Sequence, residues 1–287
     1  MITTKSPQPR SHGIHMLTSP MLGITDLFDQ ASGEHQELFD AELPAWSALD
    51  KLGAYLQNLL ADCRPSPLID SGVPLARPVV VHGSRFIDGD SCTIDLDPAG
   101  VEEFLVSHNG QILQGASLIM AGVTIIGAQL RIGAGVLIES GAFIKTPVIL
   151  DDGAQIRHGA YLRGNCMIGK RAVVGHATEV KNSIFLDDAK AGHFAYVGDS
   201  ILGSGVNLGA GTKLANFKFT PGNVQVQAEN EFIDSGRRKL GAILGDGVQT
   251  GCNSVTSPGT VLGKDSVVMP NITVAAGFYH ARCRIRH

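Results

Sequence analysis

The sequence lacks the features that mark several large classes of protein. Its five cysteines are scattered and odd in number, with no Cys-x-x-Cys pair, which argues against a disulfide framework or a zinc cluster. No stretch of roughly 18 apolar residues occurs, and the N-terminus lacks the apolar core of a signal peptide. The net charge of −4 gives no footprint for nucleic acid. We therefore expect a reduced, cytoplasmic protein.

Aromatic residues are also scarce, at 6% of the chain, whereas glycine is abundant, at 35 of 287 residues. Glycine makes up about 7% of average proteins, so this excess needs a structural reason. A narrow interior has little room for aromatic rings. Its tight corners need glycine where the backbone takes a positive φ or closely approaches a neighbour. The composition thus favours a slender, repetitive fold.

A branched aliphatic residue stands at every sixth position through the centre of the chain. The series comprises Ile126, Ile132, Ile138, Ile144, Leu150, Ile156, Leu162, Ile168, Val174, Val180 and Leu186. An α-helix has about 3.6 residues per turn and a plain strand alternates every two, so neither produces this period. A six-residue repeat is typical of a parallel β-helix, in which each hexad forms one flat side of a triangular coil. The sequence therefore predicts a mainly β protein of hexapeptide repeats.

The rest of the chain divides around this repeat. Residues 1–33 have little periodicity and are expected to form a flexible N-terminus. Residues 34–110 are expected to form a helical and transition segment, whose helix over 34–62 packs on the repeats or joins subunits. The β-helix is predicted over 111–275, followed by a C-terminal tail, 276–287.

Two interruptions break the repeat. The register slips around residues 190–198, and the hexads stop over residues 217–239 before they return at Leu244. Extra residues between coils are expected to protrude as loops, and loops on a rigid scaffold are where functional residues usually lie. The two interruptions are therefore where we expect the functional site.

The sequence around the first interruption resembles a known family. Residues 190–199 read KAGHFAYVGD, residues 206–212 read VNLGAGT, and Asn216 follows. Together with Tyr161–Arg163 and Glu179–Lys181 upstream, these residues are similar to the acetyltransferase domain of GlmU-type bifunctional enzymes.

The resemblance covers roughly residues 110–275. Residues 235–241, SGRRKLG, resemble a branch of archaeal and bacterial sugar-1-phosphate nucleotidylyltransferase-like proteins. The resemblance implies a left-handed parallel β-helix that assembles as a homotrimer, with acetyl-CoA as co-substrate. The implied reaction transfers acetyl to the amine of glucosamine 1-phosphate, in the pathway to UDP-N-acetylglucosamine. Neither a nucleic acid nor a membrane is an expected partner.

By the same resemblance, three residues take catalytic roles. His193 is the general base that removes a proton from the sugar amine, a task that suits an imidazole with a pKa of about 6.5. Asn216 contacts the amine or the acetyl group, and Glu179 orients His193 or binds the ammonium. His158 and His176 lie on outward or corner positions of the repeat and are expected to be structural.

Other residues are implied in binding the acceptor. Arg163 and Lys181 hold the sugar phosphate, because a planar guanidinium fork and an ammonium both suit a dianion. Tyr196 and Asn207 donate to the phosphate or to sugar hydroxyls. Asn207 and Asn216 have an alternative role as turn-formers or as an internal asparagine stack.

A further set is implied in binding the donor. The coils that carry Ala210 and Cys252 line the acetyl-CoA groove. Arg237 and Arg238 bind the CoA phosphates, with a solvated charge run and a subunit contact as open alternatives.

The chain departs from the family at three points. No lysine occurs over residues 220–225, just after Asn216, where the family carries one or two. Cys252 stands where the bifunctional enzyme has serine. Residues 1–110 hold no Gly-x-Gly-Thr-Arg phosphate loop, so we do not expect this chain to make UDP-sugars by itself. The missing lysines bear on both the substrate and the level of activity.

Three alternatives stand beside the acetyltransferase. An acyltransferase that acts on another nucleotide-linked sugar shares the fold but has a different context around its histidine. A γ-type carbonic anhydrase needs three zinc-binding histidines, commonly with a His-x₄-His pair, and the coil sequences contain no such pair, so no metal is expected. A degenerate β-helix that serves as a non-catalytic binding or regulatory subunit would account for the missing lysines.

Overall fold

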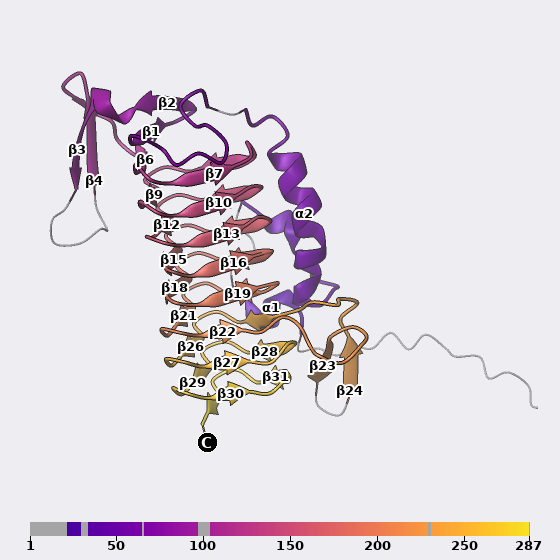
Figure 1. Cartoon of the computed structure of the whole chain (residues 1–287). Helices are drawn as coiled ribbons and strands as arrows, with labels where there is room; N and C mark the ends of the chain where they lie inside the picture. The colour runs from indigo at the N-terminus through magenta and orange to yellow at the C-terminus, as the bar shows by residue number, and fades with distance from the viewer. Residues whose placement is uncertain (1–21, 30–33, 65, 97–103, 229–230, 287) are drawn as a thin grey trace, which may run out of the picture.

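The computed structural model describes residues 22–29, 34–64, 66–96, 104–228 and 231–286. Most of these residues form a parallel β-helix, a stack of coils that each contribute one strand to three flat faces (Figure 1). This confirms the β-helix that the six-residue repeat predicted. The first residues of the chain, which we expected to be flexible, lie outside the described residues.

The first face contains the strand that begins each coil. Its parallel strands are β6 (Ser117–Ile119), β9 (Leu137–Ile138), β12 (Gln155–Ile156), β15 (Val173–His176), β18 (Lys190–His193), β21 (Asn207–Leu208), β26 (Gln249–Thr250), β29 (Val267–Val268) and β32 (Arg284–Ile285). Two antiparallel strands, β1 (Val79–His82) and β2 (Arg85–Asp88), extend this face at its N-terminal end.

The second and third faces complete each coil. The second face consists of β7 (Thr124–Ile126), β10 (Phe143–Lys145), β13 (Tyr161–Arg163), β16 (Glu179–Lys181), β19 (Tyr196–Gly198), β22 (Lys213–Leu214), β27 (Val255–Thr256) and β30 (Thr273–Val274). The third face consists of β8 (Leu130–Ile132), β11 (Val148–Leu150), β14 (Cys166–Ile168), β17 (Ser183–Phe185), β20 (Ile201–Leu202), β25 (Ala242–Leu244), β28 (Thr260–Leu262) and β31 (Gly277–Tyr279).

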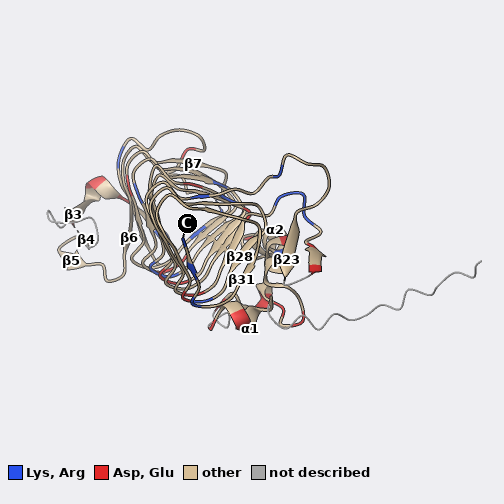
Figure 2. Cartoon of the chain, turned by 90° about the horizontal axis from the view of Figure 1, so that it is seen from below, with Lys and Arg blue, Asp and Glu red and all other residues tan. Residues whose placement is uncertain are grey.

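Smaller elements decorate the coils. The helices are α1 (Ile24–Leu27) and α2 (Ala48–Leu59), with short 3₁₀ turns at Gln36–Leu38, Ala45–Ser47 and Gly89–Ser91. A separate sheet of β3 (Cys92–Leu96), β4 (Phe104–His108) and β5 (Gln111–Ile112) projects past β6, and a hairpin of β23 (Gln225–Ala228) and β24 (Glu231–Asp234) lies near the opposite end (Figures 1 and 2).

Stacked aliphatic side chains fill the interior of the coils. Ile144, Leu162 and Val180 follow one another on the second face, and all three are fully buried. Burial of each such side chain contributes about 1.5–3 kcal/mol. The coils also approach each other closely at glycine: a Cβ on Gly175 would overlap the carbonyl of Gly192 in the next coil. Close approach, and not a positive φ, therefore explains the glycine that follows Val174.

The first residue of the predicted aliphatic series is misplaced. Ile126 is 37% exposed, whereas its neighbour Ile125 is buried and pairs with Ile144. The period of six fails at this first hexad, because seven residues instead of six separate the inward Ile125 from Ile132.

The predicted slip has a different form, because two corners each lose one residue. Leu150 pairs with Ile168, and Ile168 pairs with Phe185, so the coil becomes one residue shorter before Phe185. Phe185 therefore enters the core, and Leu186 packs outside it. Residues 190–198 form regular strands, so the loop expected there is absent. One shortened corner lies at Asn182, which takes a φ of 46°. The other lies between Val197 and Leu202, two inward residues that are five positions apart, at the end of the range where the slip was predicted.

The second interruption does protrude as predicted. Residues 217–239 leave the sixth coil after β22 and carry the β23–β24 hairpin before β25 resumes the third face (Figure 1). A bridge between Phe217 and Lys239 closes the base of this insertion.

Helix α2 covers the outside of the third face. Its buried residues Leu49, Leu52 and Leu56 belong to one apolar cluster with a column of outward side chains on that face. The column comprises Ile149, Met167, Ile184, Ile201, Ile243 and Val261. Figure 2, viewed along the coils, shows α2 beside this face. No helix in the described part of the chain is long and apolar enough to cross a bilayer.

Three predicted boundaries need correction. The helix expected over 34–62 begins only at Ala48, because the chain before it makes short 3₁₀ turns on either side of Pro44. Residues 22–28, placed in the flexible N-terminus, contain α1, which packs against the same apolar cluster. The coils run on to Ile285 instead of ending at 275, because β31 pairs with β28 and β32 with β29.

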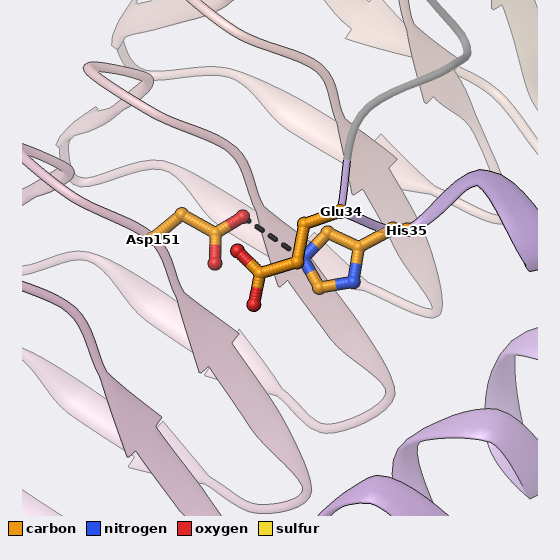
Figure 3. A group of neighbouring side chains, drawn as sticks. All are labelled: Glu34, His35 and Asp151. Atoms are coloured by element: carbon orange, nitrogen blue, oxygen red, sulfur yellow. Dashed lines mark hydrogen bonds and ion pairs between the residues drawn. The ribbon is translucent and has the colours of Figure 1, made fainter.

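A polar cluster, in which His35 and Asp151 are buried, links the N-terminal segment to the first coils. Glu34, His35 and Asp151 point toward one another (Figure 3), and His35 Nε2 lies 3.0 Å from an Asp151 oxygen. The guanidinium of Arg131 lies among them, 2.9 Å from Asp151 and 3.0 Å from Glu34. His35 Nδ1 is 2.6 Å from the Tyr55 hydroxyl on α2. Since Arg131 supplies the positive charge, we assign this group to ion pairing and not to metal binding.

Candidate active site

A pocket of about 430 Å³ opens on the second face, close to the corner that this face shares with the first. Its lining residues are Ala177, Glu179, Phe194, Ala195, Tyr196, Lys213, Ala215, Asn216 and Phe217. Glu179, Tyr196 and Lys213 lie side by side because β16, β19 and β22 pair in parallel register. Three of the predicted site residues, Glu179, Tyr196 and Asn216, thus meet in one pocket.

Tyr196 and Asn216 are held together above a glycine. A Cβ on Gly198 would lie 2.6 Å from both the Tyr196 hydroxyl and the Asn216 amide nitrogen, so only glycine admits both side chains. The pKa of Tyr196 is raised by burial and by the negative charges of Glu179 and Asp199, and the hydrogen bond with Asn216 opposes that rise. Tyr196 therefore keeps its proton at neutral pH and offers a hydrogen-bond donor to a ligand.

The buried carboxylate of Asp199 lies beneath this pair. Asn216 donates to Asp199 Oδ2 at 2.6 Å, and Asn182 donates to Oδ1 at 2.8 Å. Lys181 Nζ lies 3.2 Å from Oδ2, and an Arg237 nitrogen lies 3.5 Å from Oδ1. Asp199 stands in the quoted motif, but the sequence analysis gave it no role. Asp199 takes a φ of 50°, in a region that non-glycine residues occupy mainly when they are Asn or Asp.

A row of cations runs beside the pocket. Arg163 pairs with Lys145 across β13 and β10, and Lys181 occupies the equivalent position one coil further on. Arg163 donates to Glu179 at 2.7 Å, so the structure gives Glu179 a partner other than His193. Within the described residues no hydrogen bond joins Glu179 to His193, and the expected orienting role has no support in one chain.

His193 ends β18 at the corner beside the pocket. Its side chain is exposed, and its ring makes no hydrogen bond to another described residue. Phe194, which follows it, lines the pocket. His193 is thus accessible to a ligand at the rim of the pocket.

Two other histidines build the corner above it. His158 and His176 stack with their rings 5.5 Å apart, and Phe194 packs edge-on against His176 at 5.2 Å. His176 Nδ1 donates to the His158 carbonyl at 2.9 Å, and His158 Nδ1 donates to the Ser140 carbonyl at 2.6 Å. Both rings are thus tied to the corner, as expected of structural histidines.

Lys213 is a pocket residue that the sequence analysis missed. It is exposed, and its ammonium donates to the Gly211 carbonyl at 2.6 Å. The family motif places its lysine downstream of Asn216, whereas pairing of β19 with β22 brings a lysine from upstream of Asn216 to the side of Tyr196. The signal was present, since Lys213 follows the quoted VNLGAGT segment directly.

The coil corners below His193 form a continuous line. The Gly211 amide donates to the His193 carbonyl, and the Asn253 amide donates to the Ala210 carbonyl. The Asn271 amide then donates to the Cys252 carbonyl, so Ala210 and Cys252 lie on successive corners, as the groove prediction requires.

This line of corners ends at a second pocket. The pocket has a volume of about 340 Å³ and is lined by Met269, Pro270, Ile272, Arg284 and Arg286. The sequence analysis missed both arginines, since it treated residues 276–287 as a tail.

The arginines of the insertion occupy different environments. Arg237 is largely buried between the carboxylates of Asp50 on α2 and Asp199, and its predicted contact with CoA has no support within one chain. Arg238 lies over the Phe217 ring at 4.3 Å, at the edge of the first pocket. The charge run thus divides into one structural and one surface arginine.

Asn207 does not join the pocket within one chain. It lies exposed on β21 of the first face, paired with Lys190 and Gln249, whereas Tyr196 lies on the second face. The other predicted acceptor ligands, Arg163 and Lys181, also lie on the second face.

Comparisons with known proteins match the β-helical part of the chain. Residues 144–285 match the model of the GMPPB C-terminal domain. A bifunctional sugar-1-phosphate nucleotidylyltransferase/acetyltransferase of Sulfurisphaera tokodaii is 42% identical over 101 residues, which cover 35% of this chain and 25% of that protein. A bifunctional protein GlmU of Methanococcus maripaludis is 38% identical over 112 residues, covering 39% and 27%. The chain thus spans about a quarter of the length of these relatives.

Solved structures add a more distant likeness. The UDP-N-acetylglucosamine acyltransferase of Francisella novicida has 17% identity and a TM-score of 0.33, over 53% of this chain and 54% of that one. The similarity to known families therefore rests on the family model and the sequence relatives, and not on this structure. The β-helical part of this chain is therefore similar to the acetyltransferase-bearing GlmU-type proteins and to the GMPPB C-terminal domain, which confirms the resemblance found in its motif.

Proposed function

We propose that this chain is an acetyl-CoA-dependent N-acetyltransferase that acts on an amino sugar phosphate, with glucosamine 1-phosphate as the first candidate. The observation that carries the proposal is the pocket in which Tyr196, Asn216 and Lys213 meet beside the cations Arg163 and Lys181. Donors and positive charge on adjacent coils suit a sugar that bears a phosphate dianion.

His193 supplies the general base in this proposal. The sugar amine attacks the carbonyl carbon of the acetyl thioester, and a carbon–nitrogen bond forms while His193 takes the amine proton. The carbon–sulfur bond then breaks, and the CoA thiolate leaves with the proton that His193 returns. An exposed ring without a competing hydrogen bond supports this role.

The donor has a path along the line of corners. From His193 it passes Ala210 and Cys252 and reaches the pocket of Arg284 and Arg286. Successive coils lie about 4.8 Å apart. A path that crosses several coils therefore suits an extended pantetheine arm, with the phosphates of CoA at the two arginines. Arg284 and Arg286 replace Arg237 as the proposed phosphate contacts, whereas Arg238 stays a prediction.

The proposal includes a homotrimer. The acceptor pocket is open on the surface of a single chain, and Asn207 lies on a different face from Tyr196. A second copy would close the pocket and bring its own Asn207 to the phosphate. Size measurement of the purified protein by light scattering tests this part separately.

The experiment is an assay of thiol release from acetyl-CoA with glucosamine 1-phosphate, galactosamine 1-phosphate or a UDP-linked amino sugar as acceptor. We expect turnover with a sugar monophosphate, and we expect His193→Ala to lower kcat by about 10²–10⁴-fold. His158→Ala is the matched control, because it removes a corner imidazole outside the pocket. Turnover only with the UDP-linked sugar would identify a nucleotide-sugar acyltransferase, and failure to bind acetyl-CoA at all would favour a non-catalytic subunit.

A further inference from the structure

Asp199 holds together side chains from several segments of the chain. Its carboxylate contacts Lys181 and Asn182 of the preceding coil, Asn216 of the following coil and Arg237 of the insertion. The Asp199 side chain is only 5% exposed. A buried carboxylate of this kind is stable only when it is paired and hydrogen-bonded, so these contacts depend on one another.

Arg237 extends this network to the N-terminal helix. One of its terminal nitrogens pairs with Asp50 on α2, and the other lies 3.5 Å from Asp199. The Arg237 side chain is 14% exposed, whereas that of Asp50 is 55% exposed. A guanidinium can span two carboxylates in this way because its donors form a rigid planar fork, which an ammonium lacks.

We propose that Asp199 is a positioning residue that fixes Lys181 and Asn216 for the acceptor, and that Arg237 and Asp50 couple this arrangement to α2. The inference rests on the proposed function, since it assigns Lys181 and Asn216 to acceptor binding. Asp199 itself lies beneath these side chains with only 5% of its own side chain exposed, so in this proposal it acts through them and not on the acceptor directly. Acceptor affinity therefore depends on how α2 and the insertion, residues 217–239, pack against the coils.

The residues that face Asp199 explain the expected effect of its removal. Without the carboxylate, Lys181 loses its acidic partner and samples other rotamers, while Asn216 loses the oxygen that orients its amide. Both groups then bind the acceptor less well, because their ordering must occur on binding. The donor corners at Ala210 and Cys252 make no contact with Asp199 in the described residues, so donor binding should be unaffected.

Asp199→Asn and Arg237→Lys test the proposal in the assay above. We expect each to raise the KM for the acceptor, by tenfold or more for Asp199→Asn, while the KM for acetyl-CoA changes less than twofold. Arg171→Ala, which breaks an Arg–Asp pair with Asp188 away from the pocket, is the matched control and should change neither value. A role confined to stability would lower the amount of active enzyme and leave both KM values unchanged.

A double-mutant cycle provides a readout that needs no activity. We expect the effects of Asp50→Asn and Asp199→Asn on thermal unfolding to be non-additive, because both carboxylates act through Arg237. Additive effects, or an unchanged acceptor KM in an active Asp199→Asn protein, would overturn the inference alone. A wild type that neither turns over nor binds glucosamine 1-phosphate by calorimetry would overturn the proposed function, and the inference with it.

Discussion

The second and third faces of the β-helix are built from the same coils but present different chemistry outward. On the third face, the outward residues from Ile149 on β11 to Val261 on β28 are apolar, and they pack in one cluster with α2, α1 and the insertion. On the second face, the equivalent outward residues include Tyr161, Glu179, Tyr196 and Lys213, and no helix covers them in the described structure. The inward positions thus fix the coil, whereas the outward positions decide whether a face binds the chain's own helix or a ligand.

The largest expected effect comes from a charge on the covered face. Ile184→Asp would place an unpaired carboxylate at a fully buried position between α2 and the coils. We expect a loss of more than about 4 kcal/mol of unfolding free energy, or failure to fold. Tyr161→Asp is the comparison on the second face, which no helix covers in the described structure and where Lys145 and Arg163 are neighbours. This substitution should lower the unfolding free energy by less than about 1 kcal/mol. Denaturant unfolding measures both, and similar losses would contradict the difference between the faces.

Truncation of a buried leucine on α2 and of an exposed leucine on the same helix tests how strongly this helix is packed on the third face. Leu52 is fully buried and Leu59 is 43% exposed, so Leu52→Ala should destabilise by about 3 kcal/mol and Leu59→Ala by less than about 1 kcal/mol. Hydrogen exchange should show faster exchange of the α2 amides in Leu52→Ala, with the amides of the coils still protected. Equal acceleration throughout the coils would mean that α2 and the β-helix unfold as one unit.

The cluster around Asp151 links the N-terminal segment to the third face through charge. Burial raises the pKa of Asp151, but His35 and Arg131 outweigh it through hydrogen bonds and charge, so the folded-state pKa lies below its usual value. The resulting stability is present above the unfolded pKa and is lost as the pH falls through the folded pKa. We expect Asp151→Asn to lose about 2 kcal/mol at pH 7 and to show a weaker decline below pH of about 4. Unfolding curves from pH 7 to 2 test this, and identical acid profiles would contradict it.

Much of the interior could be predicted from the sequence, because an inward aliphatic has few substitutes in a narrow coil. The series fails at Ile126 and Leu186, where a corner gains or loses one residue. A fixed period of six then assigns the inward position to the wrong residue. The apolar column of the third face was also visible, for Ile149, Met167 and Ile184 each precede an inward residue.

The site was harder to predict than the coil. The motif gave Tyr196 and Asn216, which the structure brings together. The role of Asp199 depends on side chains from distant segments that only the fold brings together, so spacing alone could not reveal it. Arg237 looked like part of an exposed charge run, because sequence shows charge but not the buried carboxylates that pair with it.

The smallest expected change in stability belongs to the open face. Arg163 and Glu179 form a surface ion pair, with side chains 42% and 35% exposed, and such pairs contribute little to folding. We therefore expect Arg163→Ala to alter the unfolding free energy by less than about 0.5 kcal/mol. In the acetyltransferase assay, the same substitution should raise the acceptor KM about tenfold, because a charged hydrogen bond to the phosphate is lost.

Arg163→Lys separates charge from geometry at this position. An ammonium keeps the positive charge but loses the planar fork, so an intermediate KM is expected. Arg163→Ala could instead lower stability as strongly as Leu52→Ala and leave the acceptor KM unchanged. The outward ion pairs would then stabilise the second face in the way that α2 stabilises the third face. The contrast between a ligand-binding face and a structural face would then be lost.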